Sequence, residues 1–405
     1  MVRSGVLLAA GAIALAGLVT QGAPAATGHV PGALPGAHRL ALGMAHTCLL
    51  ARSGEVWCWG DGFTAKSPVG LGPGRRAATI VAGDFHTCAI LAPGTPDAGA
   101  VRCWGENGAG QLGVGTTTRT GNDRSPSAAP AVDLGPGSTA VALAAGSNFT
   151  CAILRGPEDG AVRCWGGNSS GQLGLGSTAT IGDDELPSSV GPVDLGGHRA
   201  VAIAAGGFHA CAILDDGALQ CWGGNGTGEL GQGDSTNIGD RDTPAAHPPV
   251  RIGTGRTATA VAAGLGTTCA ILDTGATRCW GYGGGGGLGL GDDESVGDDE
   301  PPAAVPVVQL GEGRRAVTLA LGAYHSCALL DDGTVRCWGP NGRGELGYAN
   351  TIPIGDAATP DQAGPVELEG RVVEIVAGGY HTCVLLEQGS LQCWGPDDIG
   401  PLSFD

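Results

Sequence analysis

Seven pairs of cysteines constrain the fold of this chain more than any other feature of its sequence. The second cysteine of every pair begins the tripeptide Cys-Trp-Gly, and all 14 cysteines are used in this way. A motif that recurs along the whole chain indicates tandem copies of one supersecondary unit. The pairs are Cys48 with Cys58, Cys88 with Cys103, Cys151 with Cys164, Cys211 with Cys221, Cys269 with Cys279, Cys327 with Cys337 and Cys383 with Cys393.

The repeats read as β-strands. Each consists of short stretches of Val, Ile, Leu and Ala broken by Gly, Asp and Asn, and Val201 and Ile203 alternate with alanine. We place four strands in a repeat: a Pro-Val segment, a segment ending at Ala-Gly, a strand with the first cysteine and a strand with Cys-Trp-Gly. The sequence therefore predicts an all-β fold, a seven-bladed β-propeller of four-stranded antiparallel blades. A linear solenoid would need distinct capping repeats, which the chain lacks.

The spacing of the cysteines agrees with hairpin geometry. If Asp215–Gly217 forms the turn of its repeat, Cys211 lies directly opposite Cys221, and such facing α-carbons are about 4.5–5.5 Å apart, within reach of a disulfide. We predict seven disulfides, one within each blade. The same register places each tryptophan of Cys-Trp-Gly opposite a small residue, and we expect these indoles to pack between neighbouring blades.

Residues 1–25 have the features of a secretory signal peptide. Arg3 precedes an apolar run, Val6–Val19, which ends before Ala23-Pro24-Ala25, and the run is too short to span a bilayer comfortably. Because disulfides persist in oxidising compartments, export and paired cysteines support each other. We predict a secreted, periplasmic or cell-surface protein with an N-terminal segment at 26–37 and the propeller at 38–405. Whether the first blade takes a strand from the tail Pro396–Asp405 or builds its own from residues 30–37 is left open.

Charge and motifs exclude several classes of function. A net charge of −18 argues against sequence-independent binding to nucleic acid, which requires a cationic surface. The chain has no nucleophile elbow, no His-Glu-x-x-His motif and no phosphate-binding loop. We therefore predict a monomer that is not an enzyme, with no catalytic residues, no cofactor and no metal site.

The repeats resemble the regulator of chromosome condensation family of propeller repeats. The resemblance rests on Ala-Ala-Gly-x-x-His-Thr-Cys-Ala-Ile-Leu, Asp-Gly-x-Val-x-Cys-Trp-Gly and Asn-Gly-x-Gly-x-Leu-Gly, and it covers residues 38–396. It implies a seven-bladed propeller. Exported bacterial relatives include a proteinaceous β-lactamase inhibitor, which points to protein binding, whereas an exported acidic chain would not meet the nuclear partners of the family's founder.

Two rings of loop residues are candidates for function. The residue three positions before the first cysteine is aromatic in four repeats, which suits recognition of a protein, unless these side chains only cover the channel mouth. The next residue is histidine in five repeats, which we interpret as structural and bonded to nearby backbone, since Phe149 and Thr267 replace it elsewhere. The aromatic residues are Phe85, Phe208, Tyr324 and Tyr380, and the histidines are His46, His86, His209, His325 and His381.

Acidic insertions follow several Cys-Trp-Gly strands. Clustered carboxylates at 183–185, 240–242 and 298–300 could bind calcium, but none has the spacing of an EF-hand, and we favour a solvated acidic rim. We expect an exported, non-catalytic module that binds another protein through loops on one face. The alternatives are a secreted carbohydrate-active hydrolase and a structural surface component with calcium-linked acidic loops.

Overall fold

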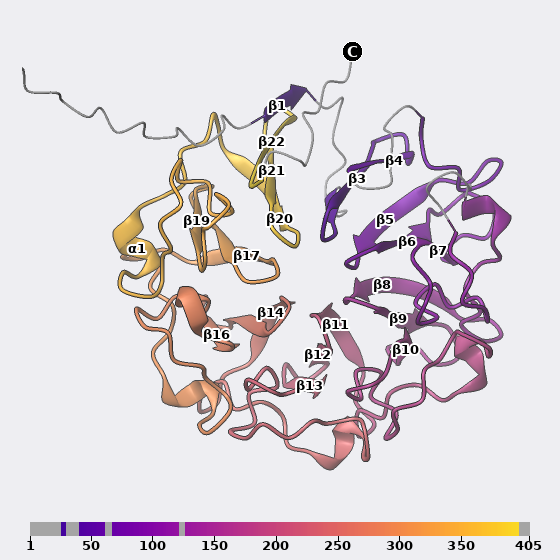
Figure 1. Ribbon diagram of the computed structural model, residues 1–405. Coiled ribbons are helices and arrows are strands. Elements are labelled where there is room, and N and C mark those ends of the chain that lie inside the picture. The colour runs from indigo at the N-terminus through magenta and orange to yellow at the C-terminus, as the bar shows by residue number, and fades with distance from the viewer. Residues whose placement is uncertain (1–25, 30–39, 61–66, 121–125, 397–405) are drawn as a thin grey trace, which may run out of the picture.

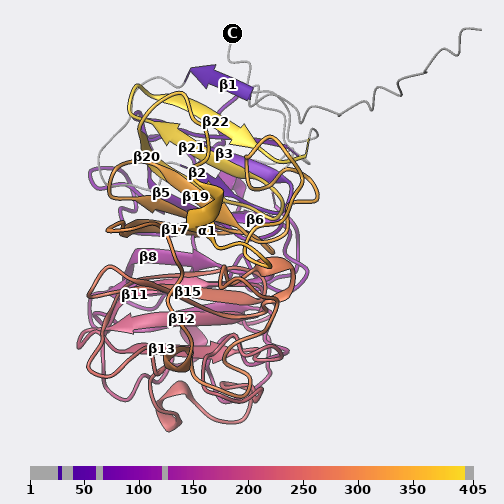
Figure 2. The same ribbon diagram turned by 90° about the vertical axis from the view of Figure 1, so that its left-hand side faces the viewer.

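The computed structural model describes residues 26–29, 40–60, 67–120 and 126–396. In this part of the chain, seven antiparallel sheets stand around a central axis as the blades of a propeller (Figure 1). In the side view the strands run across the thickness of the ring (Figure 2). The expected all-β fold with seven blades is therefore confirmed. The predicted signal peptide at 1–25 lies outside the described residues.

Three strands make up the common unit of a blade, and the first of them lies nearest the axis (Figure 1). The inner strands are β2 (Leu40–Leu42), β5 (Ala77–Ala82), β8 (Thr139–Ala145), β11 (Ala200–Ala205), β14 (Ala258–Ala263), β17 (Ala316–Leu321) and β20 (Val372–Ala377). The middle strands are β3 (His46–Leu50), β6 (His86–Leu91), β9 (Phe149–Arg155), β12 (His209–Leu214), β15 (Thr267–Leu272), β18 (Ser326–Leu330) and β21 (Thr382–Leu386). The outer strands are β4 (Val56–Gly60), β7 (Val101–Gly105), β10 (Val162–Gly166), β13 (Leu219–Gly223), β16 (Thr277–Gly281), β19 (Val335–Trp338) and β22 (Ser390–Trp394).

The Pro-Val segments are not regular strands, so the prediction of four strands in every blade is wrong. Val193 donates one backbone hydrogen bond to Val162 of β10 (2.8 Å), and Val250 does the same to Leu219 of β13 (2.8 Å). Each segment thus lies along the outer strand of the blade that precedes it in the chain. The prolines at these segments have no N–H to donate, which keeps them from extending a ladder.

Short helical turns precede most of these segments. The side chain of Arg163 in β10 donates to the carbonyl of Pro187 (2.7 Å), and Gln220 in β13 donates to that of Pro244 (2.8 Å), so a polar residue of the outer strand holds each turn. The turns are the 3₁₀ turns η1 (Pro126–Ala128), η2 (Pro187–Ser189), η3 (Pro244–Ala246) and η5 (Pro302–Ala304), and the single-turn helix α1 (Pro360–Ala363). A further 3₁₀ turn, η4 (Gly284–Gly286), follows β16.

The last blade gains a fourth strand from the other end of the chain. β1 (Ala26–His29) pairs antiparallel with β22, with Ala26 opposite Cys393. A hydrogen bond between the Thr47 hydroxyl and Nε2 of His381 (2.9 Å) also helps to close the propeller, because it crosses the junction of the first and last blades. Residues 26–29 complete a blade, whereas the two segments considered from the sequence, 30–37 and 397–405, lie outside the described residues.

All seven predicted disulfides are present. Cys211 lies directly opposite Cys221 between β12 and β13, and every pair joins the middle and outer strands of one blade. The α-carbons of each pair are 4.0 or 4.1 Å apart, close to the roughly 4.5 Å of a non-hydrogen-bonded cross-strand pair. A loop of this length contributes about 3 kcal/mol in the chain-entropy model.

The tryptophans pack between blades, as predicted. Trp222 faces Ala210 in the register of β12 and β13, and its side chain is fully buried. Its indole N–H donates to the carbonyl of Gln172 in the preceding blade (3.1 Å), and Trp165, Trp280 and Trp394 make the equivalent bond. The indole therefore contributes both apolar contact and one hydrogen bond to each of these junctions.

A ring of seven glycines surrounds the axis, one at the end of each inner strand. A β-carbon on any of them would overlap the carbonyl oxygen of the glycine in the next blade. Neighbouring inner strands therefore approach more closely than any residue with a side chain would permit. The glycines are Gly43, Gly83, Gly146, Gly206, Gly264, Gly322 and Gly378.

Replacing one glycine of this ring tests the packing at the axis. In Gly264→Ala the new methyl group would collide with backbone of the next blade, and we expect the free energy of unfolding to fall by about 1–3 kcal/mol. Gly226→Ala is the matched control, because Gly226 is exposed and has no atom within 4 Å of an added β-carbon. Equal unfolding curves in denaturant for the two variants would contradict the proposed constraint.

Candidate functional site

The four predicted aromatic residues lie at one end of the propeller, in the loops that join inner to middle strands. Phe85, Phe208 and Tyr324 have exposed fractions of 47%, 45% and 43%. Tyr380 is half-buried because the guanidinium of Arg343 stacks over its ring, 4.0 Å from the centroid. We call this end of the propeller the aromatic end. Three of the four side chains are thus too exposed to serve mainly as packing against a neighbouring blade.

A fifth aromatic residue at this end escaped the sequence analysis. In the fifth blade the equivalent position is Gly266, and its carbonyl accepts a hydrogen bond from the N–H of Tyr282 (2.8 Å). A β-carbon on Gly266 would lie 3.6 Å from that of Tyr282, whose side chain is 42% exposed. Tyr282, which directly follows Cys-Trp-Gly, therefore stands beside the place that the missing aromatic would take. We name Phe85, Phe208, Tyr282, Tyr324 and Tyr380 the aromatic ring.

The five histidines form hydrogen bonds between blades. The Nε2 atom of His209 lies 2.8 Å from the hydroxyl of Thr268 in the next blade, and both side chains are buried. The interpretation as structural residues agrees with this geometry, but the partner of Nε2 is a threonine side chain and not backbone. The pairs are His46 with Thr87, His86 with Thr150, His209 with Thr268, His325 with Thr382 and His381 with Thr47.

The two exceptions follow from the same pairing. In the third blade Phe149 replaces the histidine, and the residue at the acceptor position of the fourth blade is Ala210, which has no hydroxyl. In the fifth blade Thr267 replaces the histidine, and the residue at the acceptor position of the sixth blade is Ser326. This coupled change was present in the sequence, and it would have identified the partners.

Burial keeps these imidazoles neutral. It lowers the pKa of His209 and of His325 from 6.5 to about 4. The pKa of His86 and of His381 falls to about 3, where burial is again the largest cause and neighbouring histidines add to it. Buried rings whose Nε2 is already bonded do not form an accessible metal site or a solvent-facing pH sensor.

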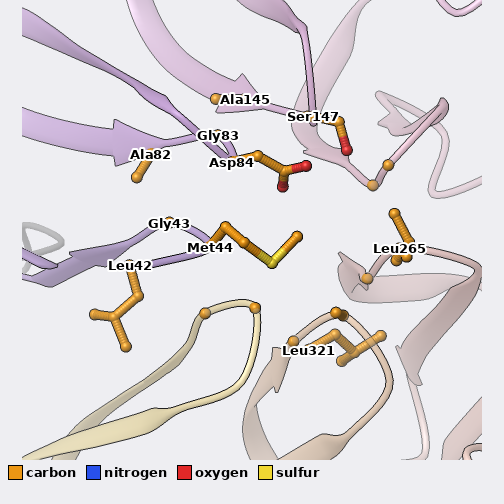
Figure 3. A pocket seen from close by; sticks show the side chains of 18 of the residues that line it. Leu42, Gly43, Met44, Ala82, Gly83, Asp84, Ala145, Ser147, Leu265 and Leu321 are labelled. Atoms are coloured by element: carbon orange, nitrogen blue, oxygen red, sulfur yellow. The ribbon is translucent and has the colours of Figure 1, made fainter. Parts of the chain in front are cut away.

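A pocket opens on the axis at the centre of the aromatic end (Figure 3). All seven blades contribute to its lining, each with the ring glycine and the residues on either side. The pocket has a volume of about 120 Å³, measured as the space open to the centre of a water molecule. Phe85 directly follows the lining residue Asp84, and Phe208 directly follows Gly207. The same loops therefore shape the pocket and carry much of the aromatic ring.

The acidic insertions border the same end. Ile181 forms an isolated bridge with Gly166, the last residue of β10, which places Asp183, Asp184 and Glu185 near that end of the strand. Asp298, Asp299 and Glu300 form a second such group, whose ligand atoms lie within 4.8 Å of one another. Burial and then a hydrogen bond with Asp299 raise the pKa of Glu300 to about 7, so a shared proton can relieve the repulsion within this group.

The fold and the repeated loops define a protein built from seven tandem propeller repeats. Two profiles of the Regulator of chromosome condensation (RCC1) repeat match residues 39–63, 77–111, 140–172, 200–229, 316–345 and 372–397, and residues 98–153, 159–213 and 279–329. The matched residues make up more than half of the chain. The chain belongs to the regulator of chromosome condensation repeat family.

Relatives with this repeat differ widely in length. The chain is 29% identical over 385 residues to the ultraviolet-B receptor UVR8 of Arabidopsis thaliana, covering 90% of this chain and 78% of that one. It is 28% identical over 341 residues to the human probable E3 ubiquitin-protein ligase HERC6, covering 80% of this chain but only 29% of that protein. The crystal structure of Prp20p from Saccharomyces cerevisiae has a TM-score of 0.64 at 19% identity, with 89% and 83% of the two chains covered. That structural likeness concerns the fold.

The buried histidines predict a loss of stability in acid. In the unfolded chain His209 takes up a proton as the pH falls through 6.5, whereas in the folded protein it stays neutral down to about pH 4. The contribution of neutral His209 to the free energy of unfolding is therefore complete above pH 6.5 and is lost as the pH falls from 6.5 to about 4. His209→Phe combined with Thr268→Ala copies the natural pair Phe149 and Ala210. When the pH falls from 6 to 5, we expect the free energy of unfolding of this double variant to decrease by about 1 kcal/mol less than that of the wild type.

The measurement is denaturant unfolding at a series of pH values. Thr268→Ala alone keeps the imidazole and is the control, since it should retain most of the wild-type pH dependence. The same pH dependence in the double variant and the wild type would contradict the assignment of His209 as a buried neutral group.

Proposed function

We propose that this chain is an exported, non-catalytic propeller that binds another protein through the aromatic ring. The observation that carries the proposal is the contrast between its aromatic side chains. Trp104, Trp165, Trp222, Trp280 and Trp338 are buried between blades, whereas four members of the aromatic ring have exposed fractions of 42–47% at one end. Large exposed apolar side chains grouped on one face favour an interaction surface.

The scaffold suits such a surface. The loops of the aromatic end begin and end in strands that are fixed by disulfides, inter-blade hydrogen bonds and the glycine ring. Because the loops are held in place, little conformational entropy is lost when a partner binds. Tyrosine and other aromatic residues dominate the energetics of many protein interfaces, which supports a protein partner over a small metabolite.

Family membership and the cysteines support the remaining parts of the proposal. The solved structure of Prp20p is described with its binding to Gsp1p and histones, which are proteins. Seven disulfides are consistent with an oxidising compartment, as expected for an exported chain. The nuclear partners that the family resemblance implies do not suit an exported chain of net charge −18, so we propose an extracellular or cell-envelope protein as the partner.

Affinity capture with the oxidised mature protein tests the proposal. Extracellular and envelope proteins of the source organism and its neighbours would be offered to the wild type and to a variant with Phe85, Phe208, Tyr324 and Tyr380 all changed to alanine. We expect at least one protein to bind the wild type and its capture by the variant to fall more than about 100-fold, as when several hot-spot residues are removed. Thermal unfolding of both proteins checks that the variant folds.

A second variant controls for the loss of exposed apolar surface. Val141, Val201, Val317 and Val373 are exposed at the start of the inner strands, which is the opposite end of the propeller, and each can be changed to threonine. This valine variant should retain the partner. Loss of the partner from the valine variant, with retention by the aromatic variant, would place the interface at the wrong end for our proposal. Turnover of glycans by the purified wild type would favour the hydrolase instead.

A further inference from the structure

Asp84 is the one ionisable side chain among the residues that line the axial pocket. It is half-buried, and no ion pair to it exists within the described part of the chain. The remaining lining consists of glycine and alanine backbone together with Leu42, Met44, Leu265 and Leu321. Burial raises the pKa of Asp84, which is the usual effect of taking a carboxylate away from water without a cation.

Ser147 supplies a second polar group on the same wall. Ser147 is 4% exposed, and its hydroxyl faces the Asp84 carboxylate as a hydrogen-bond donor, which partly offsets the effect of burial on the pKa of Asp84. Figure 3 shows the hydroxyl and the Asp84 carboxylate directed toward one another at the side of the pocket. Asp84 and Ser147 therefore form one polar pair on the wall of the pocket, whose remaining oxygen lone pairs can accept hydrogen bonds from a bound cation.

Within the residues that the structure describes, the junction between the second and third blades lacks one backbone hydrogen bond that most of the other junctions have. At the axis, the N–H of Met44 donates to the carbonyl of Asp84 (2.9 Å), and the N–H of Ser147 donates to that of Gly207 (3.3 Å). No such bond from Asp84 to the third blade occurs among the described residues. Asp84 and Ser147 thus flank a junction that has one backbone hydrogen bond fewer than most of the others in the described part of the chain.

The opposite wall of the pocket is apolar. Figure 3 shows the side chain of Met44 extending across the pocket from the first blade, with Leu265 of the fifth blade beyond it. The available space exceeds the roughly 10–15 Å³ that one water requires, and it suits the end of a slender side chain. One apolar wall and one carboxylate wall match an aliphatic stem that ends in a positive charge.

Resting on the proposed function, we propose that the axial pocket receives a lysine or arginine side chain of the protein partner, with its charged group against Asp84 and Ser147. Both cations offer several N–H donors, which the carboxylate and the hydroxyl can accept. The surrounding surface favours a cation, since acidic groups at 183–185 and 298–300 border the same end. Arg343 on Tyr380 shows that a member of the aromatic ring already holds a guanidinium.

Side-chain analogues test the pocket without a known partner. n-Butylammonium, n-butylguanidinium and uncharged n-pentanol would each be titrated into the oxidised protein, with the amide signals of Asp84 and Ser147 followed by NMR. We expect one or both cations to shift these signals with a Kd on the order of millimolar, as suits ligands of so few atoms, and pentanol to have little effect. The peptide acetyl-Gly-Gly-Lys-Gly-Gly-amide would then test whether a lysine presented on a chain also enters.

Matched variants separate contact from general charge. Asp84→Asn should weaken binding of the cation at least tenfold, whereas Glu312→Gln, which removes an exposed carboxylate at the opposite end of the propeller, should leave the Kd within twofold of the wild type. If Asp84→Asn does not fold, Ser147→Ala replaces it, with a smaller loss expected. Absence of cation binding to the wild type, or equal weakening in the Asp84 and Glu312 variants, would overturn the proposal.

Three further outcomes separate the docking proposal from a small-amine site and from the proposed function. Entry of the free amines but not of the lysine peptide would make this a small-amine site and overturn the docking proposal. A captured protein that needs the aromatic ring but binds Asp84→Asn as well as the wild type would do the same and leave the proposed function intact. Cation binding at Asp84 with no loss of capture in the aromatic variant would reject the proposed function alone.

Discussion

The close approach of neighbouring inner strands at the axis determines what the other positions of each repeat can hold. Glycine is required where one strand end meets the next carbonyl, and a β-carbon on Gly206 would also collide with the ring of His209. The space left by glycine is therefore occupied by the imidazole, which reaches Thr268 in the following blade. One steric constraint thus links glycine, histidine and threonine in most blades. In the natural exception the ring of Phe149 fills the same space beside Gly146, and the residue at the acceptor position of the next blade, Ala210, has no hydroxyl because Phe149 cannot form a hydrogen bond with one.

Register and pairing could be predicted because they depend on local geometry. A short turn at Asp215–Gly217 leaves one arrangement of β12 and β13, and it brings Cys211 opposite Cys221. The strand count could not be obtained in this way, since Val193 makes only one bond to β10 and the proline beside it ends the ladder. Closure by Ala26–His29 depends on where the two ends of the chain meet, which no local pattern reports.

Positions in the candidate site were predictable only where one repeat could be compared with another. Alignment of the repeats places Phe85, Phe208, Tyr324 and Tyr380 in equivalent loops, and the structure puts them at one end. Tyr282 is not at that position in its repeat, so only three-dimensional proximity to Gly266 relates it to the others. Asp84 and Ser147, by contrast, hold equivalent positions, each directly after its ring glycine, and the closure of the ring brings these two adjacent blades together at the pocket.

The scaffold has near-sevenfold symmetry, and that symmetry would be a problem for a protein that must bind its partner in one orientation. A ligand recognised by the shape of the ring alone would have seven nearly equivalent ways to sit on the axis. The residue after each ring glycine differs between blades, being Asp84 in one and Leu265 in another. The aromatic ring is also interrupted, at Ala45 and Asn148. One carboxylate on one side of the pocket and two gaps in the ring break the symmetry, so the orientation of a bound partner would follow from these variable residues and not from the repeat.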